Sequence, residues 1–345
     1  MRILIIGGTG LISTAITRCL VERGDDLTLY NRGQTEADIP EGYKTITGNR
    51  KDYAAFEVQM AESGNFDAVI DMIGFVPADV ESAIRAFRGR IGQFIFCSTV
   101  DVYTKPAHHY PIRENAERQP MLSFPYAYNK EKCERLLEAA HDRGDFPVTI
   151  IRPAHTYGEG RELIHSFGLG GAYYFNRIRL GKPIITHGDG SSLWAACHRD
   201  DVGRVFAEAV GNQQTFGKAY HTASEEAMTW NQYHQTVAQA MNAPEPKLIH
   251  IPTDVLFEIA PKEAEWCREN FQYNNIFDNT AARTDLNFGY TILFVEGVRR
   301  IVAWLDDRDR IHDKDEPPAY EEIIKGWKRL STKEAFFEKA DGAKA

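Results

Sequence analysis

Cysteine is scarce in this sequence, and the few cysteines are not arranged in pairs. The chain of 345 residues has five of them, an odd number scattered along its length. A disulfide framework needs an even set at short, regular spacings, so this class of small secreted fold is excluded. We expect small buried residues or free thiols, typical of a reducing compartment, at Cys19, Cys97, Cys133, Cys197 and Cys267.

Long apolar runs and an excess of positive charge are also missing. No run reaches the roughly 18 apolar residues that span a bilayer. The first strand that the pattern predicts begins at residue 2, which leaves no room for a signal peptide, so we expect a cytoplasmic protein. The net charge is −9 and the pI about 5.7, which argues against nucleic acid and anionic membranes as partners.

Metal-binding patterns are missing as well. His108 and His109 are adjacent, so they cannot share one face, and no cysteine pair accompanies them. Asp200 and Asp201 are better explained as acids in the first turn of a helix than as a ligand pair. The sequence therefore predicts no metal site.

The chain is rich in apolar residues, and its first 31 residues show how they are organised. With 43% hydrophobic residues and this length, we expect two domains or one domain with an added lobe. Residues 3–6 are a short apolar strand, glycines follow at 7, 8 and 10, and a helical pattern runs from 11 to 23 before a second strand at 27–30. This order is typical of the first unit of a dinucleotide-binding fold.

The glycine-rich turn predicts a pyrophosphate site. Gly7 allows a tight turn, and Gly10 lets the backbone approach phosphates closely. The free N–H groups near Leu11 and Ile12 then face the negative charge at the start of the helix. The third glycine of the usual motif is replaced by Ser13, which is small enough for a modest loss of packing. The alternative is an ordinary buried strand–helix unit with a glycine-rich turn.

The end of the second strand bears on the choice between NAD and NADP. An acid there binds the ribose 2′-hydroxyl group, whereas an arginine accommodates a 2′-phosphate. Here Asn31 is neutral and Arg32 follows it, which favours NADP. Asparagine can also bond a ribose hydroxyl, and Arg32 can be a solvated turn residue, so NAD stays open.

Strands and helices then alternate, which predicts an α/β fold with a Rossmann-type, doubly wound parallel sheet and a smaller C-terminal substrate-binding α/β lobe. We expect the NAD(P)-binding domain at 1–153, with the chain re-entering it in parts of 188–225. The substrate-binding lobe is expected mainly at 154–330 and a charged tail at 331–345. Further strands are expected at 43–47, 66–72, 92–98, 148–151 and 181–187, and helices from Asp52 and at 77–88, 126–141, 198–210, 230–241, 252–271 and 294–305.

Tyr126 and Lys130 form the central chemical pair. Four residues apart on a predicted helix, they share one face. A nearby ammonium and an oxidised nicotinamide ring both favour the phenolate, so they lower the pKa of Tyr126 from its usual value near 10. Thr99, at the end of the fifth strand, can hold a substrate oxygen. A base (Tyr126), a charge that tunes its pKa (Lys130) and a hydroxyl that orients the substrate (Thr99) suffice for hydride transfer. The tyrosine–lysine spacing alone also fits a solvated helix face.

Taken together, the motifs resemble the extended short-chain dehydrogenase/reductases, the NAD(P)-dependent epimerase/dehydratase group. The motifs are GGTGLIS at 7–13, STVDVY at 98–103, PYAYNK at 125–130, IRPAHTYGEG at 151–160, GDGSSLWAACHRDDV at 188–202 and DNTAARTDLNFGY at 278–290. The resemblance implies Thr99, Tyr126 and Lys130 as the catalytic set, a sugar or nucleotide-sugar substrate, and a homodimer built on the helices at 77–88 and 126–141.

The cofactor is expected to be NAD(P), leaning to NADP, held by a set drawn from the strand ends. Its predicted members are Gly7, Thr9, Gly10, Leu11, Ile12, Asn31, Arg32, Asn49, Arg50, Met72, Ile73, Gly74, Ser98, Tyr126, Lys130 and Pro153.

Three departures from the family pattern concern the substrate. His155 stands where the family has asparagine, and Trp194 stands where epimerase-like members place a diphosphate-binding arginine. The dehydratases carry two acids after the threonine, of which only Asp101 is present here. The predicted substrate residues are therefore Thr99, Asp101, His155 and Trp194. Loop residues that either line the substrate cleft or form an ordinary polar loop are Arg161, His165, Tyr173, Tyr174 and Arg177.

Two alternatives to a sugar oxidoreductase or epimerase stay open. The first is a sugar dehydratase that uses Asp101. The second is a non-catalytic NAD(P)-binding scaffold or an RNA-binding relative, because the sequence NRG at 31–33 is similar to the branch that includes chloroplast stem-loop RNA-binding proteins. Such relatives often lack the tyrosine and lysine that this chain keeps, and its acidic balance disfavours RNA.

Overall fold

The computed structural model describes residues 1–34 and 38–331, which form two compact units. The first unit combines Met1–Arg161, Ala195–Ala227 and Asn275–Gly297. The second combines Glu162–Trp194, Met228–Asn274 and the chain from Val298 onwards. The charged tail expected at 331–345 lies, apart from Ser331, outside the described residues.

A seven-stranded parallel sheet forms the centre of the first unit, which confirms the predicted fold class. The strand order is β3-β2-β1-β4-β5-β6-β11, so the order reverses between β1 and β4. Ligands of such sheets bind at this switch point, outside the carboxyl ends of the strands. The strands are β1 (Arg2–Ile6), β2 (Asp26–Asn31), β3 (Tyr43–Thr47), β4 (Ala68–Asp71), β5 (Phe94–Cys97), β6 (Val148–Pro153) and β11 (Lys218–Thr222).

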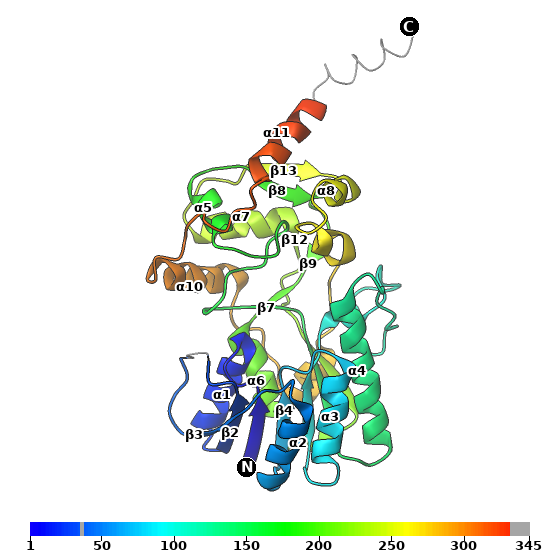
Figure 1. Cartoon of the computed structure of the whole chain (residues 1–345). Coiled ribbons are helices and arrows are strands. Elements are labelled where there is room, and N and C mark those ends of the chain that lie inside the picture. Colours follow the sequence, from blue (N-terminus) through cyan, green and yellow to red (C-terminus); the bar gives the residue numbers. More distant parts are fainter. Residues whose placement is uncertain (35–37, 332–345) are drawn as a thin grey trace. The chain divides into compact units, whose positions relative to one another are not determined.

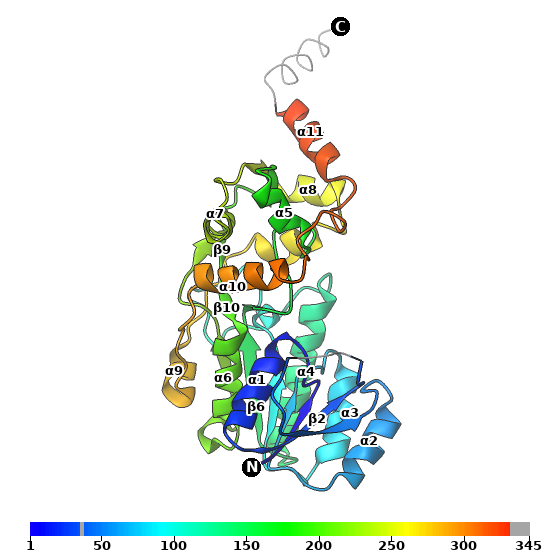
Figure 2. The same ribbon diagram turned by 90° about the vertical axis from the view of Figure 1, so that its left-hand side faces the viewer.

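Helices cover both faces of this sheet (Figures 1 and 2). Alternate residues of β1 serve the two faces: Ile3 and Ile5 join one apolar cluster, and Leu4 and Ile6 join the other. The first cluster includes residues of α1 and α6, and the second includes residues of α2, α3 and α4. The helices are α1 (Leu11–Glu22), α2 (Tyr53–Glu62), α3 (Pro77–Phe87), α4 (Pro125–Asp142), α6 (Arg199–Ala209) and α9 (Thr280–Leu286).

Shorter elements complete the first unit, most of them near the carboxyl ends of the strands. A single 3-10 turn, η1, follows β5, and β7 pairs in parallel with β10. These elements carry several of the predicted site residues. Their bounds are η1 (Val100–Val102), β7 (His155–Tyr157), β10 (Ala196–His198) and a second 3-10 turn, η2 (Gln213–Thr215).

The second unit has two small two-stranded sheets and several helices. In it β8 pairs in parallel with β13, and β9 pairs in antiparallel fashion with β12. The elements are α5 (Tyr173–Arg179), β8 (Ile184–His187), β9 (Leu193–Trp194), β12 (Met228–Thr229), α7 (Trp230–Ala240), β13 (Leu248–Ile251), α8 (Thr253–Ile259), the π-helix η3 (Cys267–Phe271), α10 (Phe294–Asp306, beginning in the first unit) and α11 (Tyr320–Leu330).

Local sequence signals explain most helix ends. The side chain of Asp52 accepts a hydrogen bond from the N–H of Ala55 and caps α2, as predicted. The expected helix over 252–271 is wrong as a single element: α8 ends at Ile259, and η3 begins only at Cys267. Pro261 explains the break, because proline disfavours helical backbone in the residue before it. No helix in the described ranges is long and apolar enough to cross a membrane.

Candidate active site

The glycine-rich turn between β1 and α1 is held by one hydroxyl group. Gly7 has φ +92°, and a Cβ atom there would lie 2.6 Å from Cγ2 of Ile73, so the turn needs glycine. The hydroxyl of Ser13 donates to the carbonyl oxygen of Gly7 (2.8 Å) and accepts from the N–H of Gly10 (2.7 Å). The serine that replaces the usual third glycine thus ties the turn together, which sequence reasoning treated only as a tolerated loss.

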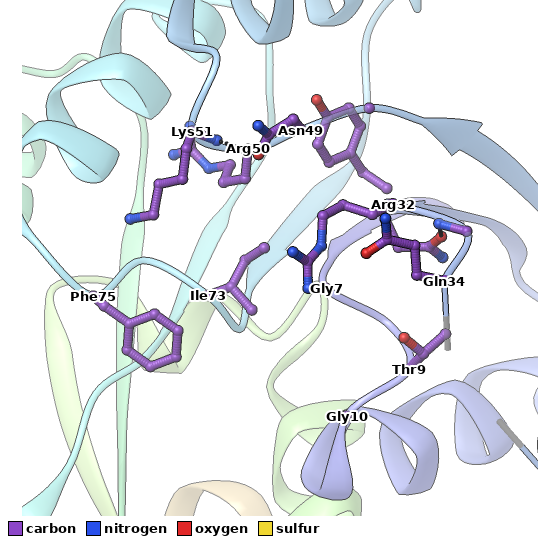
Figure 3. Close-up of a pocket in the computed structure, with 14 residues that line it drawn as sticks. Gly7, Thr9, Gly10, Arg32, Gln34, Asn49, Arg50, Lys51, Ile73 and Phe75 are labelled. Carbon is purple, nitrogen blue, oxygen red and sulfur yellow. Dashed lines mark hydrogen bonds between the residues drawn. The ribbon is translucent and has the colours of Figure 1, made fainter. Parts of the chain in front are cut away.

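A hollow of about 440 Å³ opens at this turn, at the switch point of the sheet (Figure 3). It brings together predicted cofactor residues from the ends of several strands, namely Gly7, Thr9, Gly10, Asn31, Arg32, Asn49, Arg50 and Ile73. Sequence reasoning missed other residues of the lining, although most adjoin predicted ones in the chain: Tyr30, Gly33, Gln34, Gly48, Lys51 and Phe75.

The lining of the hollow is cationic. It includes Arg32, Arg50 and Lys51, and none of its described residues is acidic. The exposed side chain of Arg32 extends across the hollow towards the turn at Gly7 (Figure 3). The side-chain oxygen of Asn31 accepts the N–H of Gly33 (2.8 Å), which fixes the turn that carries Arg32. This hollow suits an anionic ligand.

Asp79 joins two loops that border the hollow. Its carboxylate accepts from the ammonium of Lys51 (2.7 Å) and from the backbone N–H groups of Phe75 (2.9 Å) and Val76 (3.1 Å). Burial raises the pKa of this carboxyl, but these hydrogen bonds outweigh burial and hold it below its usual range. Arg50 is buried beside it, donates to the Asp79 carbonyl oxygen and lies 3.6 Å from the carboxylate of Asp71.

The other predicted cofactor residues lie at the same edge of the sheet but outside the lining of the hollow. Leu11 and Ile12 begin α1, whose first N–H groups lack partners within the helix. The rest stand where parallel strands end, with Met72 and Gly74 after β4, Ser98 after β5 and Pro153 at the end of β6.

Lys130 lies behind the wall of the hollow. It projects from α4, and its buried ammonium donates to the carbonyl oxygens of Gly74 (2.9 Å) and Cys97 (2.6 Å). The same nitrogen lies 4.8 Å from the ring centre of Phe75, a residue of the lining. The predicted catalytic lysine and the hollow therefore share the segment after β4.

Tyr126 lies on α4 one helical turn before Lys130, and it contacts Thr99. Tyr126 occupies the first turn of α4, and its phenol is hydrogen-bonded to the side chain of Thr99. Burial is the main cause that raises the pKa of Tyr126, and the charge of Asp101 adds to it, while the Thr99 hydrogen bond lowers it. The net direction is upward, so the expected lowering by Lys130 is wrong for the chain by itself, because Lys130 is directed to two carbonyl oxygens.

Asp101 completes this cluster from η1. Its carboxylate accepts from the hydroxyl of Thr99 (3.1 Å) and from the ammonium of Lys105 (3.3 Å). Lys105 also donates to the side-chain oxygen of Asn275 (3.0 Å). The structure thus brings Thr99, Asp101 and Tyr126 together and adds a lysine that sequence reasoning did not select.

The two remaining substrate predictions lie in different units. His155 is buried on β7 of the first unit, and burial, with a smaller effect of the Arg161 charge, lowers its pKa to about 3. It is therefore neutral at physiological pH. Trp194 is in the second unit, where it packs against Trp230 (ring centres 5.1 Å apart) and Phe271 (5.0 Å). That position is part of an aromatic core.

Most of the loop residues that were expected to line a cleft or stay polar are instead buried within the second unit. The hydroxyl of Tyr174 bonds His234 (2.7 Å). Arg177 pairs with Glu316 and Glu321 (2.8 Å each). His165 and Tyr173 are buried with them, whereas Arg161 is exposed and belongs to the first unit. These contacts stabilise the core of the second unit. The sequence did not indicate this core, because many of its side chains are polar.

Comparison with known proteins gives a consistent picture. The profile of the NAD dependent epimerase/dehydratase family matches residues 3–222. A 2′-dehydrokanamycin reductase from Streptomyces kanamyceticus is 25% identical over 278 residues, which are 81% of this chain and 77% of that protein. A chloroplast stem-loop binding protein of 41 kDa from Arabidopsis thaliana is 26% identical over 72% of this chain and 65% of that protein.

The fold is shared with solved structures at lower identity. An epimerase from Methanothermobacter thermautotrophicus superimposes with a TM-score of 0.73 at 16% identity, covering 91% of this chain and 94% of that one. Because the family profile matches more than half of the sequence, the chain belongs to the NAD-dependent epimerase/dehydratase family of extended short-chain dehydrogenase/reductases.

Proposed function

We propose that this enzyme interconverts a secondary hydroxyl and a ketone on a sugar or sugar-like substrate, with Tyr126 as its acid and base. The observation that carries this proposal is the hydrogen-bonded pair of Tyr126 and Thr99, together with the buried ammonium of Lys130 behind the wall of the cationic hollow. The close approach at Gly7 and the cationic lining fit a dinucleotide phosphate group. A bound nicotinamide cofactor supplies or accepts the hydride.

The chain's own residues then manage the proton. In the direction of ketone reduction, the phenol of Tyr126 gives its proton to the substrate oxygen, and the hydroxyl of Thr99 orients that oxygen. The raised pKa of Tyr126 keeps the phenol protonated at neutral pH, as this step requires. Lys130, one turn further along the same face of α4, holds the carbonyl oxygens of Gly74 and Cys97 and so fixes the segments after β4 and β5 that border this site.

NADP is the cofactor that the hollow favours. Arg32 reaches into it, and Arg50 and Lys51 add positive charge, whereas a 2′-hydroxyl of NAD is usually bound by an acid. We therefore propose NADPH as the preferred hydride donor. Steady-state assays with NADPH and NADH at equal concentrations test this preference.

Net reduction of a ketone is favoured over dehydration. A dehydratase needs a second acid beside Asp101, but Val100 holds that position and Asp101 itself pairs with Lys105. The Streptomyces relative is named a reductase, which agrees with this direction. Epimerisation uses the same proton and hydride steps, so it stays within the proposal. A nucleotide-sugar substrate is part of it too.

The test is an assay of hydride transfer with a panel of keto-sugars and nucleotide sugars. The absorbance of NADPH measures the rate. The wild-type protein should oxidise NADPH with at least one of them, and Y126F should not. A protein that binds NADPH tightly but turns over none of these substrates would favour the scaffold function instead. We also propose a homodimer that uses the outer faces of α3 and α4, and light scattering gives its mass.

A further inference from the structure

Lys105 is a lysine inside the first unit that the proposed Tyr126, Thr99 and Lys130 chemistry does not use. Its side chain is only 6% exposed. Its ammonium lies 3.3 Å from a carboxylate oxygen of Asp101 and 3.0 Å from the side-chain oxygen of Asn275. A buried ammonium is costly, so a lysine held in this way so near the catalytic tyrosine calls for a role.

The contacts form a continuous series of groups that can carry a proton. Lys105 bonds Oδ1 of Asp101, and Oδ2 of the same carboxylate accepts from the hydroxyl of Thr99 (3.1 Å). The Thr99 side chain is in turn hydrogen-bonded to the phenol of Tyr126. Each neighbouring pair is therefore in hydrogen-bond contact, from the lysine to the tyrosine.

We propose that Lys105 supplies the proton that restores Tyr126 after each reduction, through Asp101 and Thr99. This inference rests on the proposed function, because it assigns the source of the proton that Tyr126 delivers. It makes Lys105 and Asp101 positioning and relay residues, since they act on the substrate through Tyr126.

The proton balance of the relay is simple. The O–H bond of Tyr126 breaks and its proton goes to the substrate oxygen. The hydride that NADPH would supply forms the new C–H bond at the carbonyl carbon, and the π electron pair of the C=O bond moves to the oxygen. The phenolate takes the hydroxyl proton of Thr99. Lys105 protonates Oδ1 of Asp101, the carboxyl group turns about its Cβ–Cγ bond, and it then passes this proton to the oxygen of Thr99 and becomes ionised again. One N–H bond of Lys105 is broken in total, and the neutral amine regains a proton from solvent through the small part of its side chain that is exposed.

The environment of Lys105 suits a donor. Burial lowers the pKa of its ammonium, and the charge and hydrogen bond of Asp101 oppose that effect. The titratable group in contact with Lys105 is Asp101 on η1, and Tyr126 on α4 follows beyond Thr99. The neutral side chains of Thr99 and Asn275 lie beside them. Lys130 is less suited, because it already donates to two carbonyl oxygens.

Single-turnover and steady-state kinetics distinguish a relay from a structural role. Tyr126 is protonated at the start, so the first turnover needs no relay, whereas every later turnover does. In K105M, we expect the first hydride transfer from NADPH to keep its rate and the steady-state rate to fall by at least about tenfold. Ethylamine added to K105A should restore part of the steady-state rate. D101N should behave like K105M.

The matched control is K132M, because Lys132 is an exposed lysine of α4 that pairs with Glu131. Its kinetics should equal those of the wild type. Equal loss of the first and later turnovers in K105M, or an unchanged steady-state rate, would overturn the relay. Y126F separates the two proposals: a normal first turnover in Y126F overturns the proposed function, whereas the outcomes for K105M concern only the relay.

Discussion

The hydroxyl of Ser13 lies 2.8 Å from the carbonyl oxygen of Gly7 and closes the turn at which the proposed cofactor site lies. The hydroxyl oxygen of Ser13 also accepts a hydrogen bond from the N–H of Gly10. A side chain at a position usually held by glycine therefore rigidifies the turn that we propose binds phosphate. The turn can be expected to bind a pyrophosphate less well when this hydroxyl is removed.

In S13A, we expect NADPH to bind about threefold to tenfold more weakly, because the hydrogen bonds of the Ser13 hydroxyl with Gly7 and Gly10 are lost and one such bond contributes about 1 kcal/mol. Fluorescence titration with NADPH gives the dissociation constant. The control is T14A. Thr14 is on the same helix turn as Ser13, but its hydroxyl donates to the carbonyl oxygen of Leu11 within the helix. An S13A affinity equal to that of T14A would show that the turn does not need the hydroxyl.

Arg32 should decide between the two nicotinamide cofactors. In R32A, the KM for NADPH should rise at least about tenfold while the KM for NADH hardly changes, because a charge-assisted hydrogen bond to the 2′-phosphate contributes roughly 1.5–3 kcal/mol. Initial rates with both cofactors measure the ratio. The matched control R135A removes an exposed arginine of α4 that pairs with Glu131. Equal changes for NADPH and NADH would contradict recognition of the 2′-phosphate by Arg32.

Tyr126 should be essential for turnover and dispensable for cofactor affinity. Removal of its hydroxyl in Y126F should lower kcat by about 10²- to 10⁴-fold, as for other general acids. NADPH binding should persist, because the phenol is outside the cationic lining of the hollow. Y128F is the control, a tyrosine two residues further along α4. Comparable kcat values for the two variants would be incompatible with the proposed acid.

The pH dependence follows from the raised pKa of Tyr126. A phenol that stays protonated through neutral pH supports reduction there, and the reductive rate should fall only in strongly alkaline solution. Oxidation of the alcohol needs the phenolate, so its rate should rise with pH over the same range. Measured pH profiles in both directions test this, and a reductive rate that declines already near neutral pH would indicate another acid.

The sequence was sufficient for the fold of the first unit because its signals are local. Apolar strands, the cap at Asp52 and Pro125 at the start of α4 fix the elements, and the right-handed crossover of parallel strands fixes their order. The glycine motif then located one end of the hollow. The rest of the lining of the hollow depends on tertiary packing and could not be predicted. Phe75 joins the lining because β4 ends beside the glycine turn, which is no property of the local sequence.

Lys105 and Trp194 illustrate the same limit at the level of single residues. Lys105 was one of many lysines until folding placed Asn275, 170 residues away, against it. Trp194 was interpreted through a family position, whereas its contacts with Trp230 and Phe271 make it part of a core. Residue types alone predict chemistry where a motif fixes their spacing, and they fail where distant segments supply the partner.

Buried histidines should make the second unit sensitive to acid. Burial lowers the pKa of both His165 and His187 to about 4, from about 6.5 in an unfolded chain. Above pH 6.5 both states are neutral, so stability is unaffected there. As the pH falls from 6.5 to 4, the unfolded chain binds protons that the folded one does not, and stability is progressively lost. Melting temperatures measured between pH 7.5 and 4.5 should therefore fall steeply below pH 6.5.

Removal of one buried histidine should reduce this slope. His187 bonds the hydroxyl of Ser192 (3.3 Å) and packs against Trp230 (ring centres 5.4 Å apart), and H187Q replaces it with a neutral polar side chain. H187Q should be less stable than the wild type at pH 7.5 because packing is lost, yet lose less stability on acidification because one proton-binding site of the unfolded chain is gone. H109Q, at an exposed histidine, should keep the slope of the wild type. Equal slopes for H187Q and H109Q would mean that His187 does not stay neutral in the folded protein.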